Sequence, residues 1–183
     1  MERIILIETS TALCSVALAE NGTVVSYKES SAPKAHASLT AVFIREMLDE
    51  RGLKISDCDA VCVSKGPGSY TGLRVGVSTA KGLCFGSGKP LLAVGTLDTL
   101  VAQVSDEVLS GNITECQSPR YIIPMIDARR MEVYSAVFTA EGTQITETAP
   151  VIVDGNSFSE YLEQGPVLFI GDGAGKCADV LKH

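Results

Sequence analysis

Alternating apolar and polar positions predict that the chain begins with three β-strands. A short apolar run lies within 3–8, apolar and polar residues alternate over 12–20, and apolar residues return over 23–28. The turn pair Asn21-Gly22 joins the last two segments. Longer segments with helical spacing then alternate with short apolar runs. They predict a helix over 36–51, a strand over 59–64, a helix over 70–86, a strand over 90–94 and a helix from Thr96 to about Val104.

The opening pattern returns in the second half of the chain. Residues 105–119 are polar and contain Gly111, Asn112 and Pro119, which is typical of a linker. Beyond them the pattern predicts three further strands, at 122–127, 132–139 and 143–148. An internal repeat of this kind indicates a duplicated βββαβα lobe.

The end of the chain continues the second copy. Ser157 and Glu160 have capping-box spacing, which predicts a helix start, and an apolar strand follows over 167–170. We therefore predict an α/β protein with lobes at 1–105 and 119–183. The first copy has two helices and a strand beyond the equivalent point, so we expect the second lobe to be incomplete at its C-terminal end.

Residues 66–83, GPGSYTGLRVGVSTAKGL, are the most informative stretch of the chain. The third glycine is at 72, where a dinucleotide-binding fingerprint requires one at 71, and no GxxxxGK[ST] phosphate loop occurs. Gly72, Gly76 and Ala80 recur every four positions, so they share one helix face that another helix can approach closely. The alternative is a strand–turn–helix joint that serves only the chain's own packing.

The two longest predicted helices indicate a surface for a partner protein. Apolar residues cover more than one face of the helix 36–51, whereas a helix that packs only on its own sheet needs one stripe. Both helices flank the strand 59–64, so we expect them to lie side by side. The predicted partner face consists of Leu39, Phe43, Met47, Gly72, Gly76 and Ala80.

Composition and charge narrow the function classes. Hydrophobic residues make up 45% of the chain, which is enough for a core, and the net charge is −7. Proteins that bind nucleic acid alone usually have a basic surface, so we expect any nucleic-acid role to need a partner that supplies the positive surface. The six cysteines form no CxxC pair, and no apolar run reaches membrane-spanning length. We expect a cytoplasmic protein without a membrane partner.

Duplicated βββαβα lobes with an acid at the end of each first strand resemble the actin-like ATPase superfamily. Within it, three segments resemble the TsaB family, also called YeaZ, which partners TsaD in making threonylcarbamoyladenosine in tRNA. These segments are IETSTALCSVAL at 7–18, the glycine-rich stretch at 66–83 and MIDARRMEVYSAVF at 125–138. The resemblance covers nearly the whole chain, and the family normally continues beyond His183.

The resemblance implies an accessory subunit rather than a catalytic one. TsaD-type relatives hold a metal with two histidines four residues apart, and Thr96 and Leu100 occupy those places here. The only histidines are His36 and His183, so we expect no metal site. The implied partners are a TsaD-type enzyme, a TsaE-type ATPase and, in isolation, a second copy of this chain. The resemblance implies that tRNA binds only through the complex.

Glu8 and Asp127 are the acids that would flank a cleft between the lobes. The hydroxyls of Thr9, Ser10 and Thr11 follow the first acid, and Gly171, Asp172 and Gly173 lie where such folds approach adenosine. The resemblance leaves open whether ATP or ADP binds here weakly, binds at the partner interface or does not bind, and no cofactor is required. Asp127 could equally pair with the arginines beside it.

Two functions of other classes remain open from the residues alone. One is a stand-alone ATP-dependent kinase or metallopeptidase of this fold, which the missing histidines and the glycine-poor phosphate loop disfavour. The other is a binding module that homodimerises through the same helices without any role in tRNA modification. Only the scaffold interpretation predicts that a TsaD-like protein copurifies with the chain.

Overall fold

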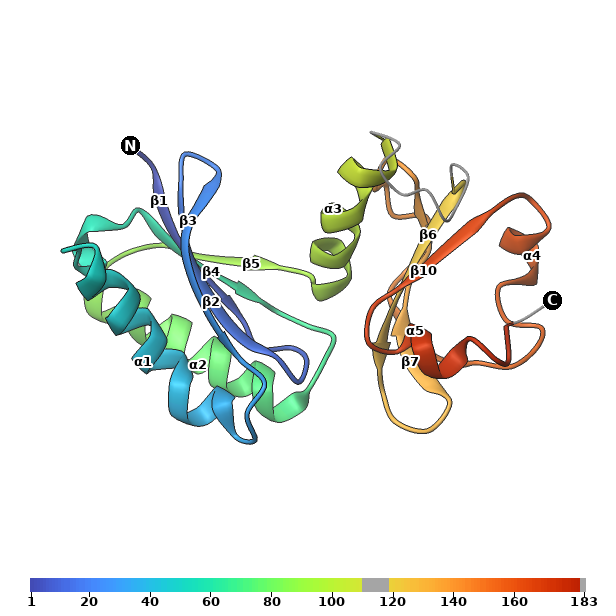
Figure 1. Cartoon of the computed structure of the whole chain (residues 1–183), viewed down its shortest axis with the longest axis horizontal. Helices are drawn as coiled ribbons and strands as arrows, with labels where there is room; N and C mark the ends of the chain where they lie inside the picture. Colours follow the sequence, from blue (N-terminus) through green and yellow to red (C-terminus); the bar gives the residue numbers. More distant parts are fainter. Residues whose placement is uncertain (110–118, 182–183) are drawn as a thin grey trace. The chain divides into compact units, whose positions relative to one another are not determined.

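The computed structural model describes residues 1–109 and 119–181 and divides into two compact units, Met1–Thr96 and Leu97–His183. The first unit is a five-stranded sheet with two long helices (Figure 1). Its elements are β1 (Arg3–Glu8), β2 (Cys14–Glu20), β3 (Thr23–Ser30), α1 (Ala35–Glu50), a short 3-10 helix (Ile55–Asp57), β4 (Ala60–Ser64), α2 (Tyr70–Ser87) and β5 (Leu91–Val94).

The strand order of this sheet is β3-β2-β1-β4-β5. β1 pairs antiparallel with β2 and parallel with β4, so the carboxyl ends of β1 and β4 lie at the same edge. α1 and α2 lie side by side on one face, as predicted (Figure 1). The core between sheet and helices contains Ile5, Ile7, Val16, Leu18, Ile44, Met47, Leu48, Val61, Val63 and Ala80.

The second unit repeats this topology. Its elements are α3 (Thr96–Leu109), β6 (Tyr121–Asp127), β7 (Glu132–Ser135), β8 (Phe138–Thr139), β9 (Ala149–Ile152), α4 (Ser159–Leu162), β10 (Val167–Ile170) and α5 (Ala174–Cys177). Its strand order is β10-β6-β7-β9, with β8 also on β6. β6 pairs antiparallel with β7 and parallel with β10, as β1 does with β2 and β4, so the predicted duplication is confirmed.

Three predictions about the second repeat were wrong in detail. The segment 132–139 forms two strands, β7 and β8, and each pairs with a different stretch of β6. Pro124 lies between these two stretches, and it has no N–H to donate to a continuous ladder. The third strand is Ala149–Ile152, and 143–148 contributes only an isolated bridge from Gln144. The capping box does not form, because Ser157 Oγ bonds to Asp154 and α4 begins after Phe158.

The division between the units falls at the start of α3, after its first residue Thr96, whereas the sequence analysis placed this helix in the first lobe. Leu97 and Val101 on this helix pack in one apolar cluster with Ile122, Ile126 and Phe138 of the second unit. The helix also continues through 105–109, which the sequence analysis assigned to a linker. Residues 110–118 of that linker, with Cys116, and the terminal His183 lie outside the described residues.

Candidate functional site

Glu8 ends β1 and holds the start of the next segment in place. Its carboxylate accepts a 2.7 Å hydrogen bond from the backbone N–H of Ser10. It also accepts a bond from the hydroxyl of Ser64, which ends the neighbouring parallel strand β4. Two of the acceptor positions that a metal-bound water would use on this carboxylate are therefore taken by the protein itself.

Thr9 and Ser10 are buried against α2 rather than presented to a ligand. Both residues are at most 1% exposed, and neither hydroxyl oxygen has a hydrogen-bond partner among the described residues. A Cβ added at Gly72 or Gly76 would collide with Thr9, and one added at Gly68 would collide with Ser10. Thr11 is half-buried, and its carbonyl oxygen lies 2.9 Å from Nε2 of His36 on α1.

This packing corrects the predicted partner face. Gly72, Gly76 and Ala80 are buried and point into the first unit, where the two glycines receive Thr9. Met47 is also fully buried in the core. These four residues therefore serve the chain's own packing, which was the alternative explanation of the glycine spacing. Leu39 and Phe43 are half-buried and remain available in part.

A second row of small residues runs along the outer face of α2. Thr71, Val75, Ser78 and Gly82 follow a 4-3-4 spacing, which is the spacing of a helix–helix seam. A Cβ at Gly82 would meet no atom within 4 Å, and the same is true of Gly86. Because glycine inside a helix costs about 1 kcal/mol relative to alanine, these two glycines have no explanation in the packing of the unit.

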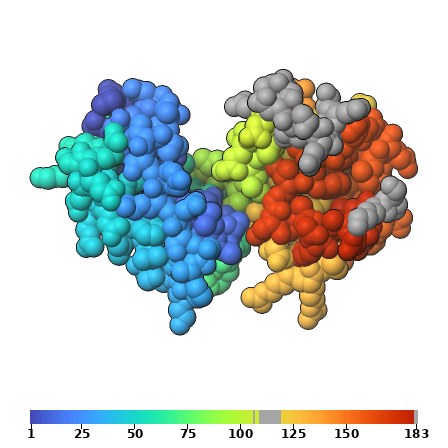
Figure 2. Space-filling model, viewed as in Figure 1, coloured from blue at the N-terminus to red at the C-terminus, as the bar shows by residue number. Residues whose placement is uncertain are grey.

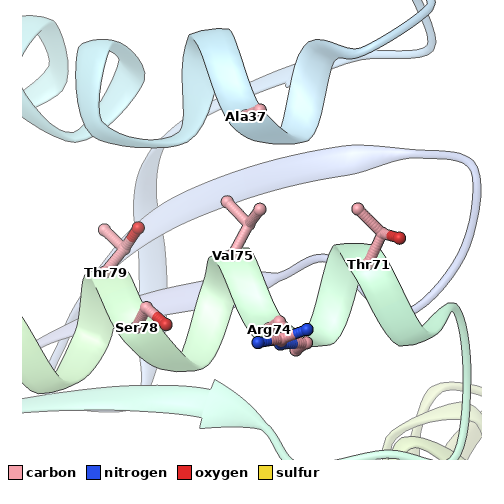
Figure 3. Close-up of a pocket in the computed structure, with 6 residues that line it drawn as sticks. All are labelled: Ala37, Thr71, Arg74, Val75, Ser78 and Thr79. Carbon is pink, nitrogen blue, oxygen red and sulfur yellow. The ribbon is translucent and has the colours of Figure 1, made fainter.

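A shallow hollow of about 450 Å³ lies where this row meets α1 (Figure 3). Thr71, Val75 and Thr79 point toward the side of α1 that carries Ala37. The other lining residues of the hollow are Arg74 and Ser78.

The guanidinium of Arg74 also lies 5.3 Å from the ring centre of the exposed Tyr70. Further along α2, Phe85 is 94% exposed. Small residues bordered by exposed aromatic rings form a surface that another helix could cover.

Asp127 ends β6 at the position that Glu8 has in the first unit. Its carboxylate accepts hydrogen bonds from the backbone N–H of Arg129 at 2.7 Å and from Nζ of Lys176 at 2.5 Å. Its own N–H donates to Asp172 Oδ1 at 2.9 Å. The hydrogen bond and charge of Lys176, with the Arg129 N–H, lower the pKa of the Asp127 carboxyl. The sequence analysis gave two explanations for this acid, a role in the cleft and pairing with the arginines beside it. The structure shows a third arrangement, because the ion-pair partner of Asp127 is Lys176.

The structure brings the remaining second-lobe residues together around the same strand end. A Cβ at Gly171 would collide with the carbonyl oxygen of Met125, and one at Gly173 would lie 2.9 Å from Val133 Cγ1. Gly171, Asp172 and Gly173 therefore pack closely on β6 beside Asp127. Sequence reasoning missed Lys176, for which the only signal was a lone lysine four residues after Asp172.

Substitution of Lys176 by methionine is expected to raise the pKa of Asp127 toward its ordinary value. The lysine is the largest cause of the lowered pKa. Because the folded pKa is depressed, the pair contributes stability above the unfolded pKa of about 3.8, and this contribution is lost as pH falls further. A carbon-13 NMR titration of the carboxyl would measure the shift, and an unchanged midpoint would contradict it.

No metal cluster or membrane span is found in 1–109 and 119–181. No three His, Cys, Asp or Glu residues are grouped as a metal would require in the part that the structure describes. Thr96 and Leu100 lie in the first turns of α3, where Leu100 packs on the apolar cluster of the second unit. No described helix is long and apolar enough to cross a membrane.

Comparisons with known proteins find a TsaD family model and TsaB relatives. The family model described as "TsaD: tRNA N6-adenosine threonylcarbamoyltransferase" matches residues 25–166. The tRNA threonylcarbamoyladenosine biosynthesis protein TsaB of Escherichia coli K12 is 35% identical over 136 residues, which are 74% of this chain and 54% of that protein. TsaB of Bacillus subtilis 168 is 30% identical over 174 residues, 92% of this chain and 70% of that protein. The chain thus spans about half the length of the first relative.

The solved structures give the same result. YeaZ from Pseudomonas aeruginosa superposes with a TM-score of 0.70 at 26% sequence identity, covering 98% of this chain and 91% of that one. The duplicated topology and the three sequence segments described above therefore share one explanation: the chain belongs to the TsaB family.

Proposed function

We propose that this chain is a non-catalytic scaffold that binds and activates a TsaD-type enzyme, which transfers threonylcarbamoyl to adenosine in tRNA. The observation that carries the proposal is the outer face of α2, defined here as Thr71, Val75, Ser78, Gly82 and Gly86. The curated relatives of the chain are named for tRNA threonylcarbamoyladenosine biosynthesis, which supports the pathway.

The outer face of α2 suits a helix of a partner protein. Small side chains allow two helix backbones to approach closely, and Phe85 supplies an exposed aromatic anchor at one end. The hollow beside Ala37 extends this surface onto α1. Leu39 and Phe43 would contribute at most at its margin, because they are already half-buried.

The same surface would hold a second copy of the chain when no partner is present. Homodimer and heterodimer would then compete, since each uses α1 and α2. A TsaE-type ATPase would join the complex at another place, and tRNA would be bound mainly by the partners, in keeping with the net charge of −7. We place this complex in the cytoplasm.

The state of the two strand-end acids favours a scaffold over the kinase alternative. Glu8 is bonded to Ser10 and Ser64, and Asp127 is bonded to Lys176. Thr9 and Ser10 face the interior, which leaves Thr11 as the accessible hydroxyl of the first loop. Binding of ATP or ADP around these residues and around Gly171, Asp172 and Gly173 would be weak or vestigial.

Affinity purification of the full-length protein from its native cells tests the proposal. A TsaD-type protein in a stoichiometric band is the expected result. The proposal is overturned if the chain purifies alone. It is also overturned if a Gly82→Leu variant, in which the outer face is obstructed, gives the same elution profile as the wild type.

Replacing Glu8 by glutamine should leave partner-supported tRNA modification largely unchanged. Glutamine keeps one oxygen that can accept the Ser10 N–H bond, and its amide NH2 can donate to the Ser64 hydroxyl oxygen in place of the bond that the second carboxylate oxygen accepts. The substitution removes the charge that phosphotransfer chemistry would need. Asp127→Asn makes the matching change in the second unit. Mass spectrometry of tRNA nucleosides measures the product. Loss of modification in a variant that folds and binds the partner normally would mean that the acids take part in the chemistry.

A further inference from the structure

The turn between β6 and β7 holds two arginines in an unfavourable backbone conformation. Arg129 has φ 74° and Arg130 has φ 49°, in the left-handed region that glycine and asparagine adopt most readily. Hydrogen bonds between Glu132 N–H and the Arg129 carbonyl and between Ala128 N–H and the Glu132 carbonyl fix the turn. Packing gives no reason for arginine here, because both residues are exposed. Such outliers gather at functional sites.

Both guanidinium groups are available to an outside ligand. In residues 1–109 and 119–181, neither guanidinium forms an ion pair within 4 Å or a ring contact. The charge of Arg129 also lowers the pKa of the nearby Asp127 carboxyl, but the ion-pair partner of that carboxylate is Lys176. In the space-filling view, the gold atoms of this turn extend as a tip from the surface of the second unit (Figure 2). Two adjacent, exposed and unpaired guanidiniums form a suitable contact for phosphate oxygens.

A hollow of about 490 Å³ lies against the same turn. Its apolar lining comes from Ala128, Met131 and Ile152, and the last of these is 76% exposed. Arg129, Arg130 and Glu132 complete the lining. Aliphatic side chains can pack against the face of a nucleobase, a neighbouring guanidinium plane can stack on it, and a carboxylate can accept hydrogen bonds from base amino groups.

We propose that this turn and hollow bind one nucleotide of single-stranded RNA, with its phosphate on Arg129 and Arg130 and its base on the apolar lining. The choice of RNA rests on the proposed function, since the partner's substrate would be a tRNA. The carboxylate of Glu132 in the hollow favours a base over an acidic protein surface, which it would repel.

The test replaces the two arginines without disturbing the turn. Arg129→Asn with Arg130→Gly removes both charges and installs residues that accept positive φ, so the variant should melt no earlier than the wild type. The isolated full chain is titrated against a fluorescein-labelled oligoadenylate of about 12 nucleotides, over about 20 to 150 mM KCl. We expect weaker binding, and a plot of log Kd against log salt that loses about 0.7 in slope for each phosphate contact removed.

Lys54→Gln provides a matched control, because Lys54 is an exposed cation of the first unit outside the hollow. The pair Arg129→Gln and Arg130→Gln repeats the measurement if the first variant melts early. An unchanged slope, or an equal loss in the Lys54 variant, would overturn the proposal. Displacement of the RNA by polyglutamate as effective as by unlabelled oligoadenylate would also overturn it, in favour of an acidic protein ligand. The assay contains no TsaD-type partner, so its outcome is separate from that of the partner-binding experiments.

Discussion

Gly82→Leu is expected to weaken association of the chain with itself and with a TsaD-type partner at least tenfold, while its fold stays intact. The added side chain would enter open space on the free chain, because no atom lies within 4 Å of a Cβ at this position. At a close helix–helix contact, the same side chain would force the backbones apart at a cost of about 1–3 kcal/mol or more, and about 1.4 kcal/mol is tenfold in affinity.

Sedimentation velocity, alone and with the partner, measures this effect, and a thermal melt verifies folding. Gly82→Ala is the matched control, because a single methyl group barely changes the surface. Alanine should also stabilise the helix by about 0.5–1 kcal/mol. If Gly82→Leu keeps wild-type affinity for both the second copy and the partner, the outer face of α2 is not the interface.

Gly76→Leu is expected to act in the opposite way, by destabilising the chain itself. The nearest atoms to a Cβ at Gly76 all belong to Thr9, which is buried and cannot move away. Overpacking of a core typically costs about 1–3 kcal/mol, and we expect a value at the upper end because β1, Thr9 and α2 are held together. A loss of about 3 kcal/mol corresponds to a fall of roughly 6–12 °C in Tm for a chain of this size.

A double-mutant cycle assigns this cost to Thr9. Gly76→Ala alone should be destabilising, and Thr9→Ala should relieve the collision by removing the hydroxyl oxygen and one methyl group. Chemical denaturation of the four proteins gives the coupling free energy, which we expect at about 0.5–3 kcal/mol. Strictly additive effects would show that Gly76 is required for a reason other than contact with Thr9.

Local sequence was sufficient for the elements and for the duplication of the fold. Apolar alternation and helical spacing depend on residues that are near one another in the chain, so β1 to β5, α1 and α2 were predicted within a few residues. Pro124 shows the limit of such patterns. It stands in an apolar run that reads as one strand, and its missing N–H matters only because a partner strand lies opposite it.

The units to which elements belong depend on contacts between distant residues. α3 follows β5 directly in the chain, yet its buried side chains pack on Ile122 and Phe138 of the second unit. The pairing of Asp127 with Lys176 joins residues 49 positions apart. Neither the helical period of α3 nor the residues beside Asp127 contain this information, since each contact exists only after the sheet of the second unit has formed.

The role of α2 is the clearest case of this division. By itself the sequence determined that α2 is a helix with a stripe of small residues on one face, that it follows a buried strand, and that the chain resembles the TsaB family. It did not determine which face is internal. Gly72, Gly76 and Ala80 have 4-4 spacing, the row from Thr71 to Gly82 has 4-3-4 spacing, and either row suits close packing against another element. Only the tertiary structure places Thr9 against the first set. That contact joins residues more than sixty positions apart, and it leaves the second set facing outward because a helix can turn only one side to its sheet.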